Sequence, residues 1–111
     1  MNRDPDHPII EKPWEYEIVS FSFQRNRTPP HESWIDLVLA RGNNVRRLRF
    51  LEPRSLAIEE GFPAPTGGMQ IVDISRRQLD GLSIEVSDFE ASNGAVRFFA
   101  RAVVDLDVET K

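Results

Sequence analysis

The sequence predicts an all-β fold, either an antiparallel β-sandwich or a small open barrel of about seven strands. Apolar and polar residues alternate with a period of two along most of the chain, as strands with one buried face require. Turn residues recur about every ten residues. The one helical signal is a short turn near 75–80, where Ser75 and Gln78 have the spacing of a capping box.

Composition limits the function classes that the chain can belong to. The 111 residues are 40% hydrophobic and 29% charged, which is typical of a globular domain. No apolar run approaches the roughly 20 residues that span a bilayer, and MNRDPDHP lacks the apolar core of a signal peptide. We therefore expect a cytoplasmic protein without a membrane partner.

Chemistry-bearing residues are few. The absence of cysteine excludes disulfides, thiol catalysis and thiolate-ligated metals. His7 and His31 lie far apart in the sequence, each close to prolines, and match no ligand or catalytic pattern. The sequence therefore predicts no catalytic residue, no metal site and no cofactor.

The first elements are an arm and a strand. Residues 1–13 contain three prolines and predict an extended N-terminal arm, with a single β domain over 14–111. The segment WEYEIVSFSF, residues 14–23, predicts the first strand. Its alternation changes phase at Ile18 and Val19, which indicates a bulge or a strand buried on both faces.

A hairpin follows the polar, proline-containing loop at 24–33. Residues 34–40 and 45–51 both alternate, and the turn between them contains Gly42, Asn43 and Asn44, which tolerate the positive φ of a tight turn. The two strands are therefore expected to be antiparallel neighbours.

The remaining predicted strands are short except for the last. Pro53 interrupts pairing before a strand at 55–59, and the loop GFPAPTGG, residues 61–68, leads to another strand at 69–74. A strand at 82–89 then turns at Asn93-Gly94. Residues 95–108 alternate throughout and predict one long final strand.

The loop 61–68 raises the possibility of a ligand site. Its glycines precede a strand rather than a helix and no lysine lies nearby, so a phosphate cradle is not predicted and a rigid crossing is the simpler interpretation. A small-ligand-binding protein or an enzyme with a pocket closed by this loop is the alternative function. Its candidate contacts are Arg54, Glu59, Glu60, Phe62, Gly67, Gly68 and Arg76.

Charge is segregated along the chain, whose net charge is −4. Residues 25–54 contain seven arginines against three acids, whereas 55–111 contain five basic and ten acidic residues. Arginine favours bidentate pairing with carboxylates, so we expect cross-strand pairs with Asp36, Glu85 or Asp105. A nucleic-acid partner is not expected for an acidic chain.

Acidic residues near strand ends define a third hypothesis, a calcium-dependent binding module. Calcium takes six to eight oxygen ligands from flexible loops. The candidate carboxylates are Asp73, Asp88, Glu90, Asp105 and Asp107.

The leading hypothesis is a non-enzymatic β domain that acts through protein–protein interaction. Its partner is either a second copy, giving a homo-oligomer, or a specific protein in an accessory or immunity-type role. Arginine and aromatic residues dominate interface hot spots. The candidates are Arg47, Arg49, Arg97, Phe99 and Arg101.

Overall fold

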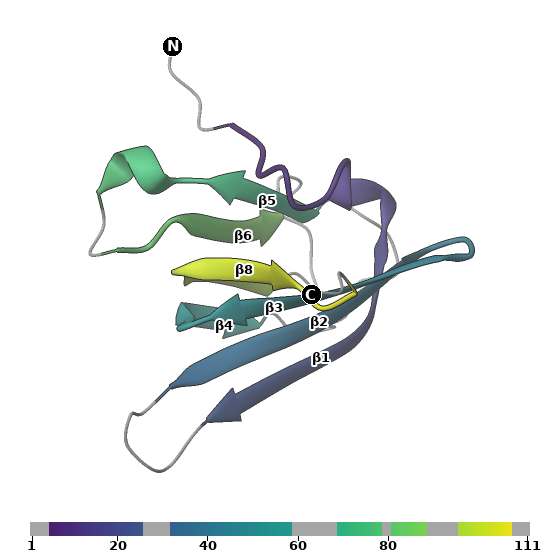
Figure 1. Ribbon diagram of the computed structural model, residues 1–111, viewed down its shortest axis with the longest axis horizontal. Coiled ribbons are helices and arrows are strands. Elements are labelled where there is room, and N and C mark those ends of the chain that lie inside the picture. The colour runs from purple at the N-terminus through teal and green to yellow at the C-terminus, as the bar shows by residue number, and fades with distance from the viewer. Residues whose placement is uncertain (1–4, 26–31, 59–68, 79–80, 89–95, 108–111) are drawn as a thin grey trace.

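The computed structural model describes residues 5–25, 32–58, 69–78, 81–88 and 96–107. These residues form an all-β sandwich of two four-stranded antiparallel sheets, as the sequence predicts. Figure 1 shows the elements. They are the strands β1 (Glu17–Arg25), β2 (Ser33–Arg41), β3 (Asn44–Leu51), β4 (Arg54–Ile58), β5 (Met69–Asp73), β6 (Ile84–Asp88), β7 (Val96–Ala100) and β8 (Ala102–Asp105), with the 3₁₀ turns η1 (Pro13–Glu15) and η2 (Ser75–Arg77).

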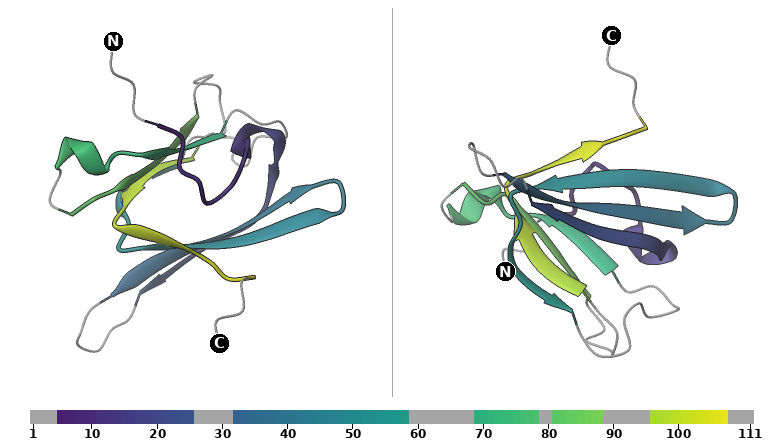
Figure 2. Two further views of the ribbon diagram at one scale, coloured as in Figure 1. Left: turned by 45° about the horizontal axis from the view of Figure 1, so that its top comes forward. Right: turned by 90° about the horizontal axis from the view of Figure 1, so that it is seen from below.

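The first sheet has the strand order β1-β2-β3-β8 and the second has the order β4-β7-β6-β5. Two chain segments cross from one sheet to the other: β3 continues into β4, and β7 continues into β8. The sheets meet along these crossings and open away from them (Figure 2). The two crossings also touch, because the Arg101 N–H donates to the Leu51 carbonyl over 2.9 Å.

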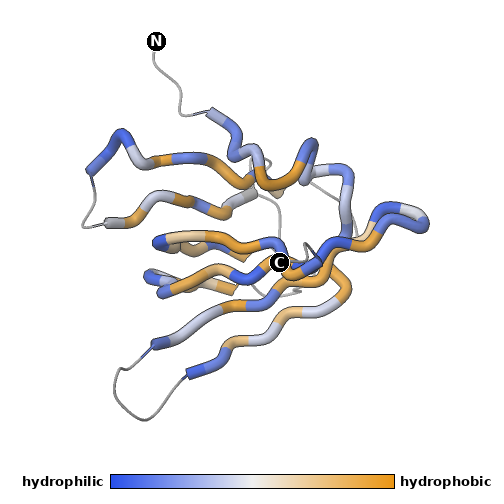
Figure 3. Tube along the Cα trace, in the orientation of Figure 1, coloured by the Kyte–Doolittle hydropathy of each residue, from blue (hydrophilic) through white to orange (hydrophobic). Residues whose placement is uncertain are grey.

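The core lies between the inner faces of the sheets. Phe50 of β3 and Phe98 of β7 meet edge to face there, with ring centroids 5.1 Å apart. Apolar and polar positions alternate along the strands that line this core (Figure 3). The buried strand residues are Ile35, Leu37, Leu39, Leu48, Phe50, Met69, Ile71, Ile84, Val86, Val96, Phe98 and Ala100.

Two local predictions are confirmed. The register of β1 against β2 shifts between Ile18 and Ser20, which is the bulge that the phase change indicates. The hairpin of β2 and β3 closes with Arg41 opposite Asn44. Gly42 has φ +60° there, which fits a two-residue turn with glycine first.

The predicted long strand at 95–108 is wrong. The chain bends at Arg101, so β7 belongs to one sheet and β8 to the other, and the described residues contain eight strands instead of about seven. The inward phase changes at the bend, because Ala100 is buried but Val103 rather than Val104 packs toward the core. An uninterrupted alternation in the sequence conceals this change of sheet.

Two further expectations are corrected at the 3₁₀ turns. Residues 13–15 form η1 rather than the start of a strand, because Pro13 stands at the first helical position, where its fixed φ is favourable. The capping box in η2 is absent. The Ser75 hydroxyl instead donates to the Asp73 carboxylate over 2.7 Å, and Gln78 ends the turn at φ +56°.

The N-terminal segment lies along β5. The His7 N–H donates to the Ile71 carbonyl and the Asp73 N–H donates to the Pro5 carbonyl, each over 2.8 Å. Ile10 and Pro13 are buried. Residues 5–13 therefore pack on the second sheet before the chain enters β1 of the first.

Candidate functional site

The interface candidates lie on two different sheets. The inner face of β3 carries Leu48 and Phe50, so Arg47 and Arg49 project from the outer face of the first sheet. Arg97 and Phe99 project from the outer face of the second sheet, because their neighbours Val96, Phe98 and Ala100 are buried. These two groups of candidates therefore cannot form one contact surface on one sheet.

On the first sheet the arginines are engaged by carboxylates. Arg49 donates to both oxygens of Asp36, at 2.8 and 3.0 Å, and its guanidinium stacks on Trp34. The hydrogen bond that Arg49 donates to Asp36 raises the pKa of Arg49 above its usual value. Arg47 donates to Asp107 over 2.7 Å, and this hydrogen bond lowers the pKa of that carboxyl.

Two further ion pairs match the expectation from residue type. Arg46 donates to Asp105 over 2.6 Å and to the Ile9 carbonyl over 2.8 Å, so it ties the N-terminal segment to β3. Arg77 of η2 lies 3.2 Å from Glu85 of β6. Asp36 and Asp105 therefore pair with arginines of a neighbouring strand, as expected, whereas Glu85 pairs with an arginine of η2 instead of a strand arginine.

Three of the five carboxylates proposed for calcium are held in other interactions. Asp105 and Asp107 bind arginines, and Asp73 accepts hydrogen bonds from the N–H and hydroxyl of Ser75, which lower its pKa. The Asp88 side chain and Glu90 lie outside the described residues. Within the described ranges no group of three or more histidine, aspartate or glutamate side chains is placed to hold a metal ion.

The second sheet brings four candidates together on its outer face. In the register of β4 and β7, Arg54 lies opposite Phe99, and Ala57 lies opposite Arg97. Arg101 follows two residues after Phe99, at the bend. We call Arg54, Arg97, Phe99 and Arg101 the arginine face. Phe99 is half-buried at its centre, and all three arginines are exposed.

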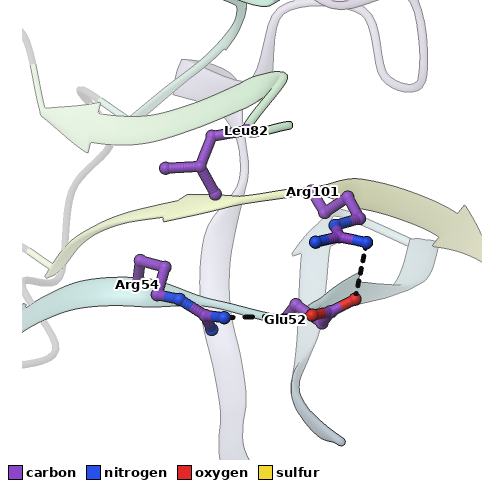
Figure 4. A pocket seen from close by; sticks show the side chains of 4 residues that line it. All are labelled: Glu52, Arg54, Leu82 and Arg101. Carbon is purple, nitrogen blue, oxygen red and sulfur yellow. Dashed lines mark ion pairs between the residues drawn. The ribbon is translucent and has the colours of Figure 1, made fainter. Parts of the chain in front are cut away.

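A hollow of about 360 Å³ lies beside the arginine face, where the two crossings meet. Its lining includes Arg54 and Arg101, together with Glu52 from the first crossing and Leu82 from the segment before β6 (Figure 4). Among the described residues of this lining, Arg54 and Arg101 bring two positive charges and Glu52 brings one negative charge.

The ion pairs in the hollow are long. The Glu52 carboxylate lies 3.3 Å from Arg101 Nη1 and 3.8 Å from Arg54 Nη2. Each arginine side chain is 56% exposed, whereas Glu52 is 30% exposed. Long, solvated pairs of this kind contribute little to stability. An incoming anion could therefore compete with Glu52 for both guanidinium groups at small cost.

Backbone geometry shapes the hollow. Glu52 has φ +51°, an uncommon left-handed conformation that precedes the buried Pro53 at the crossing. On the other side, a Cβ added to Gly81, whose φ is +83°, would meet the Arg101 side chain at 3.7 Å. Glycine suits this position because of its positive φ, whereas the Arg101 side chain would be in ordinary van der Waals contact with an added Cβ.

Sequence reasoning found part of this site. It identified Arg54, Arg97, Phe99 and Arg101 individually and placed Arg54 in a different group from the rest. It missed Glu52, and it placed Leu82 only at the start of the strand predicted at 82–89, whereas Leu82 is half-buried at the hollow. Arg76 is exposed on η2 and is not among the residues that line the hollow, and Glu59, Glu60, Phe62, Gly67 and Gly68 lie outside the described residues.

Comparison with protein-family models, with curated proteins and with solved structures finds no match for this chain. Within the part of the chain that the structure describes, no helix has the length and apolar character needed to cross a membrane. The function is therefore argued from the arginine face and the hollow beside it.

Proposed function

We propose that this chain is a non-enzymatic protein-interaction module that binds an acidic segment of a partner protein through the arginine face. The observation that carries the proposal is the gathering of Arg54, Arg97 and Arg101 around Phe99 on a chain whose net charge is −4. A local excess of positive charge on an acidic protein favours an acidic partner electrostatically.

The residue types support a contact that is both polar and apolar. Arginine and aromatic side chains carry most of the binding energy in protein interfaces. Phe99 offers a half-buried apolar centre, with Arg54 opposite it on β4 and, on β6, Glu85, whose charge is paired with Arg77. Guanidinium groups bind carboxylates with two parallel hydrogen bonds. No ion pair ties Arg97 to another described residue, so it can pair with a carboxylate of the partner.

The hollow supplies a place for one of those carboxylates. An acidic side chain that enters it would exchange the long contacts of Glu52 for shorter, better-aligned contacts to Arg54 and Arg101. Leu82 would contact the methylene groups of the same side chain. An acidic segment with an apolar residue beside its carboxylates fits this arrangement best.

The test is a binding measurement with a fluorescent peptide in which glutamates alternate with leucines, and with its glutamine counterpart. We expect Arg54→Gln and Arg101→Gln each to weaken binding of the acidic peptide about tenfold, and added salt to weaken it further. Arg47→Gln is the matched control, because Arg47 is 55% exposed and has one ion pair but lies on the other sheet. Equal binding of the glutamine peptide, or an equal loss with Arg47→Gln, would contradict the proposal.

A small anionic ligand is the second candidate, and the volume of the hollow favours it. Pockets for small molecules begin at about 300 Å³, and this hollow measures about 360 Å³. Calorimetric titration with citrate and with inorganic phosphate distinguishes the two candidates. Binding of either anion that is lost with Arg101→Gln, without binding of the acidic peptide, would favour the small ligand.

A further inference from the structure

The N-terminal segment, residues 5–11, docks on the rest of the molecule as an added edge. β5 is the last strand of its sheet, and the segment pairs with the edge of β5 that β6 leaves open. Figure 1 shows it running beside β5. Arg46 of β3 donates to the Ile9 carbonyl over 2.8 Å, and Ile10 is buried in the core. The segment therefore has a site of its own, made of both sheets, to which it is held by noncovalent contacts.

A short hinge joins this segment to the rest of the chain. Lys12 is exposed and stands between the buried Ile10 and the buried Pro13. Its backbone has φ +51° and ψ +58°, a left-handed conformation that residues other than glycine seldom adopt. A residue before proline also favours an extended backbone, and the Lys12 side chain makes no capping hydrogen bond with η1. The docked segment therefore holds its hinge in an unfavourable conformation.

We propose that two copies of this chain exchange their N-terminal segments, so that residues 5–11 of each copy pack on β5 of the other. An extended backbone at Lys12 directs the segment away from its own sheet. The contacts with β5, Arg46 and the core are then made between the copies instead of within one chain, so the exchange keeps them. What changes is the hinge, which becomes extended in both copies. Short hinges under strain favour exchange of this kind.

The cost of the exchange is that two molecules must come together. Within one chain, a short hinge presents the segment to its own site at an effective concentration of about 1 mM. Exchange would therefore need protein at about 1 mM if both hinge conformations were equally favourable. A preference of about tenfold for the extended hinge acts once in each copy, so it lowers the dissociation constant of the dimer about a hundredfold, to about 10 µM. Exchanged dimers are therefore expected at ordinary laboratory concentrations.

Substitutions at Lys12 test the hinge in both directions. Lys12→Gly makes the left-handed backbone favourable, so it should raise the dissociation constant of the dimer about tenfold or more. Lys12→Val makes that backbone less favourable and should lower the dissociation constant. Glu11→Val is the matched control, because Glu11 is also exposed but has no positive φ; we expect a change below about twofold. Sedimentation velocity measures the dimer over a concentration series, with each sample refolded from urea so that segments can exchange.

An engineered disulfide shows which copy supplies the segment. The chain contains no cysteine, so Asp6→Cys with Val72→Cys introduces one pair of thiols at the bridge between the segment and β5. The backbone hydrogen bonds on either side of this bridge make it a narrow antiparallel pair, whose Cα atoms lie about 4.5 Å apart, within the range of a disulfide. Oxidation should therefore link exchanged copies into covalent dimers, whereas a docked segment would give a disulfide within one chain. Each single cysteine variant is the control for random cross-links.

We expect covalent dimers of the double variant on a non-reducing gel, together with opposite shifts for the two Lys12 variants. Circular dichroism shows whether the double variant is folded, and the Lys12 variants carry the test if it is not. Arg54→Gln should leave the dimer intact, because the arginine face lies around β4 and β7 whereas the segment pairs with β5, so the two proposals fail separately. A chain that stays monomeric, a disulfide that forms only within single chains, or shifts of the same sign for both Lys12 variants would each overturn the proposal.

Discussion

At the residue scale, the outer face of the first sheet depends on one arginine that makes two kinds of contact. Arg49 forms a bidentate pair with Asp36 across the strands and stacks on the ring of Trp34 at 5.1 Å. The indole N–H of Trp34 is buried without a hydrogen-bond partner, so this tryptophan contributes through its ring. Only a planar guanidinium can make the paired and stacked contacts together.

Arg49→Lys should therefore lower the free energy of unfolding by about 0.5–1 kcal/mol, even though solvent screens the pair in part. Urea denaturation measures the change. Arg47→Lys is the matched control, because its side chain is more exposed and makes a single side-chain contact with Asp107; we expect a change below about 0.5 kcal/mol. An equal effect of the two substitutions would show that stacking on Trp34 and the bidentate pair with Asp36 add nothing to the free energy of unfolding.

At the element scale, local alternation predicts strands well and predicts changes of sheet poorly. The hairpin of β2 and β3 follows from alternation and from a turn residue, Gly42, that accepts positive φ. The division of residues 95–108 into two strands at Arg101 does not follow from the sequence, because both halves alternate with the same period. The site likewise depends on the pairing of strands that are far apart in the sequence, which local alternation does not predict. Alternation places Arg97 and Phe99 on one face, but Arg54 joins them only through the long-range pairing of β4 with β7.

The N-terminal segment beside β5 contains a histidine whose side chain accepts a hydrogen bond within the segment. His7 Nδ1 accepts the Ile9 N–H over 3.1 Å, which a protonated imidazole cannot do. Burial lowers the pKa of His7 from its usual 6.5, against a smaller opposing effect of the Asp73 carboxylate. The folded state therefore binds a proton on His7 less readily than the unfolded state.

Stability should accordingly fall as the pH drops through 6.5 toward the lowered pKa of His7, because the unfolded state binds the additional proton in that range. Above pH 6.5 the contribution is fully present. Thermal denaturation from about pH 7.5 to about pH 5 should show this decrease, and His7→Gln should flatten it. The Asp73 carboxyl, whose pKa is lowered from 3.8, affects the stability only under more acidic conditions. An unchanged slope in His7→Gln would rule out His7 as the cause.

At the scale of the whole molecule, the two sheets are joined on one side by the strand crossings and on the other by the N-terminal segment. Figure 2 shows residues 5–13 beside the second sheet, before the chain turns into β1 of the first sheet. Tyr16 is buried and accepts a hydrogen bond from Asn44 at the hairpin, over 2.9 Å. The segment thus contacts β5 at one end and the β2–β3 hairpin at the other, so its packing determines how firmly the sandwich is closed.

Ile10 is the side chain of this segment that contributes most to the core, since it is only 3% exposed and belongs to the main cluster of buried residues. Ile10→Ala should lower the free energy of unfolding by about 2–4 kcal/mol, through lost burial and the cavity left behind. Val45→Ala, at a position that is 41% exposed, is the control and should change it by less than about 0.5 kcal/mol. Urea denaturation followed by both tryptophan fluorescence and circular dichroism gives the comparison. If the segment closes the sandwich, both probes report one transition at a lower urea concentration, whereas an unchanged midpoint would mean that the two sheets hold together without it.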